Sequence, residues 1–452
     1  MKKRQDPPAL SKGRTTSGNT RRNQQNVISY PGKSTVRGQK RYTRPKVDSS
    51  ARRMTVKKRV SRSKAYADSR GSLQPKVTPL YVWGDFDVPF LLLALALLGF
   101  GLVMLFSASY ARAYYYEDNS FYYIGRQMLW SVIGVVGMVA ASFVNYQWLR
   151  RFAWPLYFAS VALCMLPYAF DAYNGARRTV YIGPLNFQPS EIGKFALILL
   201  FAHLMSKDQK KMKHLWDGTL RYLVLFGIMA VIVVLQPHLS ATVLMAGITV
   251  VMLFVGGANI MHLLGVGTVG VAGIAAMVFT MWGFFSDRFA HVLVRLTYWL
   301  DPFSSNDAGA YQTKQSLMAI GSGGLLGVGL GESRQKQLYL PEVQNDFIFA
   351  IICEELGFVG ACIIIILFAL LIWRGYTIAL HAKDRFGALF AVGIITQIGM
   401  QAMLNIMVVT NTIPNTGISL PLFSYGGTSL CMIMGEMGLL LSVSRQGIYE
   451  KE

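Results

Sequence analysis

From Val88 onward the sequence is a succession of long apolar runs separated by short polar segments. A helix needs about 20 mostly apolar residues to cross a bilayer, about twice the length of a strand in a membrane barrel. Lipid offers no partner for backbone N–H and C=O groups, so runs of this length predict helices. The sequence therefore predicts an all-α polytopic membrane protein with about ten transmembrane helices, over residues 88–109, 127–145, 152–170, 190–206, 220–236, 239–256, 262–283, 346–373, 386–410 and 420–443.

The net charge of +21 is concentrated before the first apolar run. Residues 1–80 contain 22 of the 44 Lys and Arg residues but only 3 of the 23 Asp and Glu residues. This stretch has too few large apolar residues to form a core, so we predict a disordered basic cytoplasmic tail followed by a membrane domain over 81–452. We favour an anchor on anionic membrane lipids over a docking tail for a cytoplasmic partner. A basic fold that binds nucleic acid is not expected, because the charge lies outside the folded part.

Loop charge predicts the orientation of the spans. Cytoplasmic loops of membrane proteins are enriched in Lys and Arg. With the tail inside, the basic loops also fall inside and both termini are cytoplasmic; these loops are 150–151, 207–221, 374–385 and the end after Arg445. The polar stretch 284–345 then forms a large extracellular loop between helices 7 and 8. Its apolar and glycine-rich part, 316–331, is expected to fold back onto the membrane domain.

Three acids lie where this loop meets the following apolar run. Asp346 precedes the run, so it could cap the helix N-terminus or act as a general base that faces an outer cavity. Glu354 and Glu355 lie inside the run, where acids are costly and usually pair with a base. Adjacent helical positions point about 100° apart, so these two acids should face different partners, and at least one should form a structural ion pair.

A second group of charged residues surrounds the fourth apolar run. Arg177 and Arg178 are predicted outside, against the charge rule, which makes them candidates for binding an anionic ligand. Glu191 and Lys194 are spaced i,i+3 on one helix face, and we favour a buried structural salt bridge between them.

The Pro/Gly/Ser-rich segment 413–429 interrupts the chain before the last span. Such breaks at membrane depth are tolerated where the backbone lines a cavity or packs on protein. The small residues Ser424, Gly426 and Gly427 allow close backbone approach, either for packing or for contact with a substrate; both interpretations remain open.

These motifs together resemble the SEDS family, the shape, elongation, division and sporulation proteins of the FtsW and RodA type. The resemblance is carried by 311–331, by Q-K-x-x-Y-L-P-E at 335–342, by D-F-I-F-A and E-E-L-G within 346–357, and by 413–429 and 188–194. It extends over about 88–445, and the 335–342 motif is closer to the division and sporulation branch, FtsW and SpoVE. It implies an inverting peptidoglycan glycosyltransferase that polymerises lipid II on the outer face of the bacterial cytoplasmic membrane. It also implies a class B penicillin-binding protein as partner, in the divisome or a related cell-wall complex.

The resemblance makes Asp346 the essential carboxylate. We expect Arg177, Arg178, Lys194 or Lys336 to offset the charge of the diphosphate, without a tightly bound cofactor; a divalent cation, Mg²⁺ or Mn²⁺, is left open. Glu191, Glu354, Glu355 and the segment containing Ser424 are expected to support the site.

One departure concerns the segment after the fifth span. Where the family commonly has an acid after Gln-Pro, this chain has His238. Two rival functions remain from the residues alone: a flippase for lipid II, suggested by the intramembrane acids, and a non-enzymatic scaffold for a penicillin-binding protein.

Overall fold

The computed structural model describes residues 85–169, 180–182, 185–236, 238–280, 297–303 and 308–447. The chain divides into two units, Met1–Leu80 and Tyr81–Glu452, and every described residue belongs to the second. The predicted basic tail therefore lies outside the described residues.

Seven described helices are long and apolar enough to span a membrane. They are α2 (Val88–Glu117), α3 (Tyr122–Phe143), Trp216–Val234 (the π-helix η4, Trp216–Leu220, with α7, Arg221–Val234), α8 (Leu239–Gly256), α12 (Ile348–Leu380), α13 (Arg385–Val409) and α14 (Gly427–Arg445). Three further helices coincide with the other predicted runs: α5 (Ala153–Met165), α6 (Pro189–Lys207) and α9 (Ile260–Thr280). The all-α membrane fold is confirmed, whereas the count of ten spans stays a prediction.

The remaining described elements are short, apart from one helix in the predicted extracellular loop. They are α4 (Tyr146–Leu149), η1 (Arg150–Phe152), η2 (Leu166–Ala169), η3 (Gln209–Lys211), α11 (Ala308–Gly323) and the antiparallel strands β1 (Val180–Ile182) and β2 (Leu185–Phe187). The small hairpin of β1 and β2 directly precedes α6 and does not alter the helical class of the fold.

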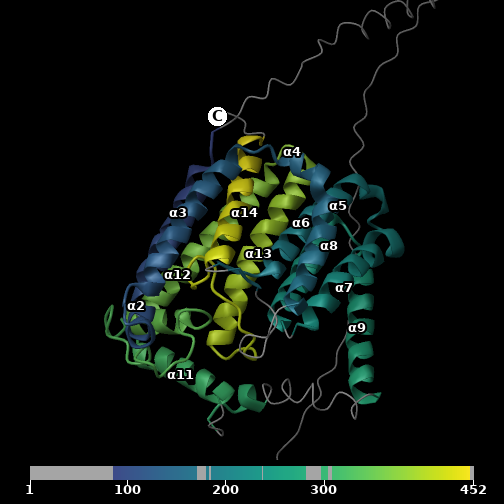
Figure 1. The fold of residues 1–452 in the computed structure, drawn as a ribbon. Coiled ribbons are helices and arrows are strands. Elements are labelled where there is room, and N and C mark those ends of the chain that lie inside the picture. The colour runs from purple at the N-terminus through teal and green to yellow at the C-terminus, as the bar shows by residue number, and fades with distance from the viewer. Residues whose placement is uncertain are drawn as a thin grey trace, which may run out of the picture. The chain divides into compact units, whose positions relative to one another are not determined.

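The helices form a bundle with α13 and α14 in its middle (Figure 1). Helix α14 packs on α3, α12 packs on both α2 and α13, and α13 also contacts α6 and α8. As a result, α2 and α3 lie on one side of the central helices, while α6 and α8 lie on the other (Figure 1).

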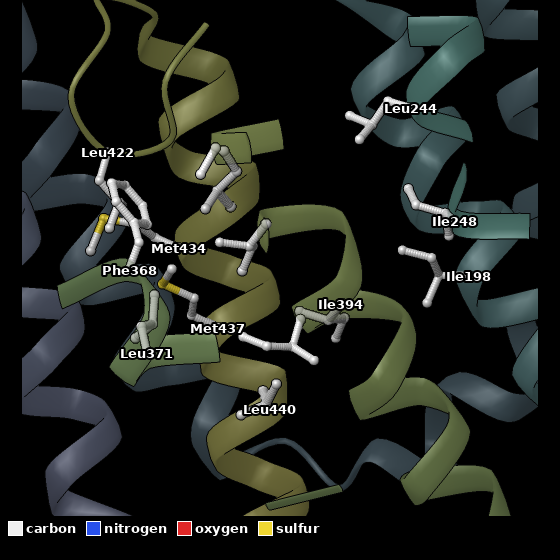
Figure 2. Close-up of a cluster of buried hydrophobic side chains, with 14 of the residues drawn as sticks. Ile198, Leu244, Ile248, Phe368, Leu371, Ile394, Leu422, Met434, Met437 and Leu440 are labelled. Atoms are coloured by element: carbon white, nitrogen blue, oxygen red, sulfur yellow. The ribbon is translucent and has the colours of Figure 1, made fainter. Parts of the chain in front are cut away.

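The apolar core follows this arrangement (Figure 2). Met434 and Met437 of α14 lie near Phe368 and Leu371 of α12 and Ile394 of α13. All five side chains are buried. By contrast, α2 and α3 expose large apolar residues on their outer sides, as helices that face lipid do. Burial is therefore greater on the central helices α13 and α14 than on α2 and α3.

Helix α12 contains a break that receives the glycine-rich loop after α11. Gly357 has a positive φ of 66°, and the backbone there forms hydrogen bonds with residues 324–329. The N–H of Val328 donates to the carbonyl of Glu354 at 3.0 Å, and that of Phe358 donates to Gly324 at 2.9 Å. A Cβ at Gly327 would overlap the carbonyl of Glu355, so only glycine allows this approach. The described part of the loop, 308–345, thus folds back onto the membrane helices as predicted.

Candidate active site

A cavity of about 540 Å³ opens at one end of the bundle. We call this the cavity end. Its walls come from the beginnings of α6, α8 and α14, from the turn before α12 and from segment 413–426. Charged and titratable side chains converge on it from several elements: Arg112, Glu191, Lys194, His238 and Asp346 line the same space, together with Glu342. Most of the predicted site residues within the described part of the chain line this cavity.

Asp346 lies in the turn that leads into α12 and lines the cavity. Its carbonyl accepts a hydrogen bond from Asn405 Nδ2 at 2.8 Å, which fixes the backbone of this turn against α13. Gly417, with φ 71°, faces the carboxylate: a Cβ there would lie 3.2 Å from Oδ2. The N-cap residue of α12 is Phe347, so Asp346 lies one residue before the N-cap position that the capping interpretation assigned to it.

The predicted pair of Glu191 and Lys194 forms in the first turns of α6. Lys194 Nζ lies 2.8 Å from Glu191 Oε2, and both side chains are almost completely buried. Lys194 also donates to Gln401 Oε1 of α13 at 3.5 Å. The salt bridge is confirmed, and both of its residues line the cavity.

His238 occupies the N-cap position of α8 and lines the cavity. Its ring contacts the side chain of Gln188 at 3.1 Å and that of Ser190 at 3.5 Å. His238 therefore links the beginnings of α6 and α8. It stands at the position where the family commonly has an acid.

Segment 413–426 forms a cavity wall whose irregular backbone is satisfied by side chains of the surrounding helices. Gln401 and Asn405 of α13, Gln127 of α3 and Ser240 of α8 donate to its carbonyls over 2.6–3.2 Å. This is the condition under which non-helical backbone is tolerated at membrane depth. The two open interpretations of the segment are thus compatible, because it is packed by protein on one side and lines the cavity on the other.

Ser424 and Gly427 have local structural roles. Ser424 Oγ accepts a hydrogen bond from the N–H of Leu420 at 2.8 Å, which closes a tight turn. A Cβ at Gly427 would overlap the indole of Trp130, so glycine allows α14 to approach α3. Ser424, Gly426 and Gly427 all line the cavity.

Lys336 is placed differently from our expectation. Its ammonium is 2.7 Å from Glu355 Oε1, both side chains are 0% exposed, and it also donates to Ser107 at 3.1 Å. Lys336 does not line the cavity. Because Lys336 does not reach the cavity and its ammonium is held by Glu355 and Ser107, Lys336 is corrected from a ligand-binding to a structural residue.

The two adjacent acids of α12 do face different partners. Glu355 pairs with Lys336 and accepts a hydrogen bond from Ser107 at 2.7 Å. Glu354 accepts from Ser333 Oγ at 2.5 Å and from the N–H of Arg334 at 2.9 Å. Together they hold residues 333–336 of the predicted extracellular loop against α12, and so fix the chain shortly before Asp346.

Arg177 and Arg178 lie outside the described residues, so their role in anion binding stays a prediction. For a metal, the described part of the chain offers no group of three or more His, Cys, Asp or Glu side chains.

Helix N-termini contribute positive potential to the cavity. Helices α6, α8 and α14 begin at its wall, and α12 begins two residues after Asp346. A helix N-terminus carries unpaired N–H groups and about half a positive charge. Four such ends around one cavity, with Lys194 among them, suit a ligand that carries several negative charges.

Two charged residues escaped the sequence analysis. Arg112 lines the cavity from α2, just beyond the predicted end of the first span. Glu436 lies in the middle of α14, buried, and accepts from Gln397 Nε2 at 2.8 Å. A lone acid in an apolar run was a usable signal for Glu436, whereas Arg112 resembled an ordinary loop arginine.

Comparisons with known proteins give a family. A profile of the family described as "Cell cycle protein" (FtsW, RodA and SpoVE) matches residues 88–448. Stage V sporulation protein E of Bacillus subtilis is 40% identical over 366 residues, which cover 80% of this chain and 98% of the relative. A probable peptidoglycan glycosyltransferase FtsW of Geobacter sp. strain M18 is 37% identical over 362 residues, covering 79% and 96%.

Solved structures agree. One chain, from work described as "Structural coordination of polymerization and crosslinking by a peptidoglycan synthase complex", aligns with a TM-score of 0.67 at 29% identity, covering 80% of this chain and 98% of its own. The rod shape determining protein RodA of Thermus thermophilus aligns with a TM-score of 0.59 at 28% identity, covering 81% and 99%. The fold therefore has solved counterparts.

Proposed function

The chain belongs to the FtsW, RodA and SpoVE family of cell cycle proteins, and from this we propose that it is a peptidoglycan glycosyltransferase that polymerises lipid II into glycan strands. The observation that carries the proposal is the cavity in which Asp346 and Lys194 lie among four helix N-termini. A carboxylate for proton transfer and a positive field for a leaving diphosphate are the two requirements of this reaction. In this branch of the family the process served is cell division or sporulation.

The reaction is a displacement at the anomeric carbon of the lipid-linked donor. The 4-hydroxyl oxygen of the acceptor's terminal sugar attacks that carbon, and its proton passes to the Asp346 carboxylate. The bond from the anomeric carbon to the phosphate oxygen breaks, and its electron pair leaves with the diphosphate. One attack from one side inverts the anomeric carbon, so no second carboxylate is needed as a nucleophile.

The leaving diphosphate gains a negative charge as the bond breaks. Lys194 and the N-termini of α6 and α8 are the groups best placed to stabilise that charge on this side of the cavity. Arg177 and Arg178 precede α6 in the chain and would add to the same side. A Mg²⁺ or Mn²⁺ ion bridging the diphosphate would supply further positive charge.

The proposed orientation of the protein in the membrane follows from the charge of its loops. The loops at the end of the bundle opposite the cavity include Lys207, Lys210 and Lys211, and the positive-inside rule assigns that end to the cytoplasm. Both termini are then cytoplasmic, and the cavity opens on the outer face of the cytoplasmic membrane, where lipid II is polymerised.

The partner we propose is a class B penicillin-binding protein that cross-links the new strand, within the divisome or a related cell-wall complex. Support comes from the similarity to a chain of a peptidoglycan synthase complex, at 29% identity over 80% of this chain.

The test is polymerisation of labelled lipid II by the purified protein, with and without its penicillin-binding partner. Asp346→Asn should abolish strand formation. Asp118→Asn is the matched control: it removes the same charge from an exposed residue after α2, where a positive φ of 51° suits Asn.

Three outcomes separate the alternatives. Strands from the wild type and from Asp118→Asn, but not from Asp346→Asn, support the enzyme. Strands from Asp346→Asn would refute the role of that carboxylate. If no variant makes strands and labelled lipid II crosses a vesicle bilayer, the protein is a flippase; if neither occurs and Asp346→Asn still supports growth, it is a scaffold.

A further inference from the structure

Basic side chains reach the cavity from two sides, not one. Lys194 and His238 reach it from α6 and α8, whereas Arg112 reaches it from α2. Helices α6 and α8 lie on one side of α13 and α14, and α2 lies on the other side (Figure 1). The turn that carries Asp346 lines the same cavity, next to segment 413–426. The proposed function uses only the α6 and α8 side for the leaving diphosphate.

Arg112 keeps unused donor capacity towards this space. One terminal nitrogen, Nη2, lies 3.1 Å from Glu342 Oε1, and the guanidinium also hydrogen-bonds the phenol of Tyr123. Its Nε is buried and has no hydrogen-bond partner among the described residues. Because a guanidinium has five N–H donors in one plane, the contacts with Glu342 and Tyr123 leave donors of the terminal nitrogens for a ligand oxygen, and the side chain is 25% exposed.

Two tyrosines complete this side of the cavity. Tyr123 and Tyr425 both line it, with ring centroids 5.1 Å apart in an edge-on arrangement. Burial raises the pKa of the Tyr425 phenol, and the neighbouring Arg126 opposes that shift only in part. The phenol therefore stays protonated at neutral pH and can donate a hydrogen bond to an anion.

The chemistry of the substrates calls for two anion sites. In the proposed reaction, donor and acceptor are both sugars linked to a lipid by a diphosphate. The attacking hydroxyl is at one end of the acceptor's sugars and the acceptor's diphosphate is at the other. The two diphosphates must therefore lie on different sides of the base, separated by the acceptor's sugar units.

We propose that Arg112, with Tyr123 and Tyr425, forms a second diphosphate subsite, which holds the acceptor while Lys194 and the N-termini of α6 and α8 hold the donor. This inference rests on the proposed function. The flat fork of a guanidinium matches two phosphate oxygens, which suits Arg112 to orient the acceptor and not only to attract it. Glu342 competes with the ligand for the same guanidinium, so the ion pair holds Arg112 in place in the empty cavity.

The competing explanation is a purely structural ion pair between Arg112 and Glu342. The side chains are 25% and 43% exposed, and such partly exposed pairs contribute little to stability. The two explanations predict different effects of removing Glu342 on ligand binding. If the pair is structural, removing either partner has the same effect; if Arg112 binds ligand, removing Glu342 releases the guanidinium to it.

The first experiment measures KM and kcat for lipid II. Arg112→Gln should raise KM about 10- to 100-fold, the usual loss for hydrogen bonds to a charged group. Arg112→Lys should lie between Arg112→Gln and the wild type, because it keeps the charge and loses the fork. Glu342→Gln should lower KM. If Arg112→Gln and Glu342→Gln both lower kcat and thermal stability with KM unchanged, the pair is structural and the inference is wrong.

The second experiment does not depend on turnover. Inorganic pyrophosphate should raise the unfolding temperature of the Asp346→Asn protein, and adding Arg112→Gln should raise the pyrophosphate concentration required about tenfold or more. Adding Asp118→Asn instead is the control and should not change that concentration.

If Arg112→Gln leaves both this concentration and KM unchanged while the enzyme polymerises, the subsite is refuted and the proposed function stands. If pyrophosphate binds through Arg112 but no strands form, the proposed function fails and the anion site remains.

Discussion

Replacing Lys336 by Met should destabilise the protein far more than the loss of one surface charge. The ammonium and its partner Glu355 are both 0% exposed and 2.7 Å apart. Ser107 donates to the Glu355 carboxylate at 2.7 Å and accepts from the ammonium at 3.1 Å. Lys336→Met removes the only cation of this cluster and leaves the Glu355 carboxylate buried with one hydroxyl donor among its described contacts.

The size of the effect follows from that unpaired charge. Breaking a buried ion pair by removing one partner costs about 3–5 kcal/mol, whereas replacing both partners by apolar residues is often neutral. We therefore expect Lys336→Met to lower the unfolding temperature by several degrees, and Lys336→Met with Glu355→Met to recover most of the loss. The control is Arg221→Met: its pair with Asp208 is 3.2 Å long but 37% and 22% exposed, and such pairs are worth about 0–1 kcal/mol.

The assay is thermal unfolding of the four proteins in one detergent, followed by intrinsic fluorescence and by loss of the monodisperse peak. The reasoning is refuted if Lys336→Met unfolds within a degree of Arg221→Met, or if the double variant is as unstable as the sum of its single changes. Lipid II polymerisation adds a second check. The double variant should recover activity along with stability, because Lys336 holds the loop and contacts no substrate; a stable but inactive double variant would return Lys336 to the ligand set.

Two glycine substitutions test the backbone geometry around the site. Gly417→Ala places a methyl group 3.2 Å from Asp346 Oδ2, at a residue whose φ is 71°. The substitution should lower kcat for lipid II at least tenfold, and the strained backbone should cost about 1–2 kcal/mol of stability. An unchanged kcat would contradict the close approach of Gly417 to the carboxylate. Gly327→Ala should lower the unfolding temperature more than Gly331→Ala does. Both glycines have positive φ (80° and 87°), but only a Cβ at Gly327 overlaps the carbonyl of Glu355. Equal decreases in unfolding temperature would contradict the docking of this loop on α12.

The sequence predicted what depends on neighbours along the chain. Apolar runs of about 20 residues became helices because lipid leaves the backbone no other partner. The i,i+3 spacing of Glu191 and Lys194 brought their charges together on α6 at 2.8 Å. The adjacent acids 354 and 355 faced different partners because the helix turns about 100° per residue.

What the sequence did not predict depends on contacts between distant segments. Lys336 meets Glu355 and Ser107 only because the loop before α12 folds over the bundle, and nothing in its neighbourhood distinguishes it from an exposed lysine. Arg112 was missed because α2 continues to Glu117, well past the point where the run of apolar residues stops. A helix is not obliged to end where it leaves the lipid, and the polar turns beyond that point carry the side chains that face the cavity.

The position of the cavity among helix N-termini matches the movement of charge in the proposed reaction. As the acceptor's proton reaches Asp346, the carboxylate loses one negative charge, and the diphosphate gains one when its bond to the sugar breaks. The total charge inside the cavity does not change; one unit moves from the turn before α12 towards the beginnings of α6 and α8. A field spread over the whole cavity stabilises the charge at both ends of this path, whereas a single cation at the leaving group would favour only the end point. Backbone N–H groups at the ends of packed helices are held by the fold and need no reorganisation during the step. For this reason removing Lys194 alone should slow the reaction less than removing Asp346, which is the only group on this path that takes the proton.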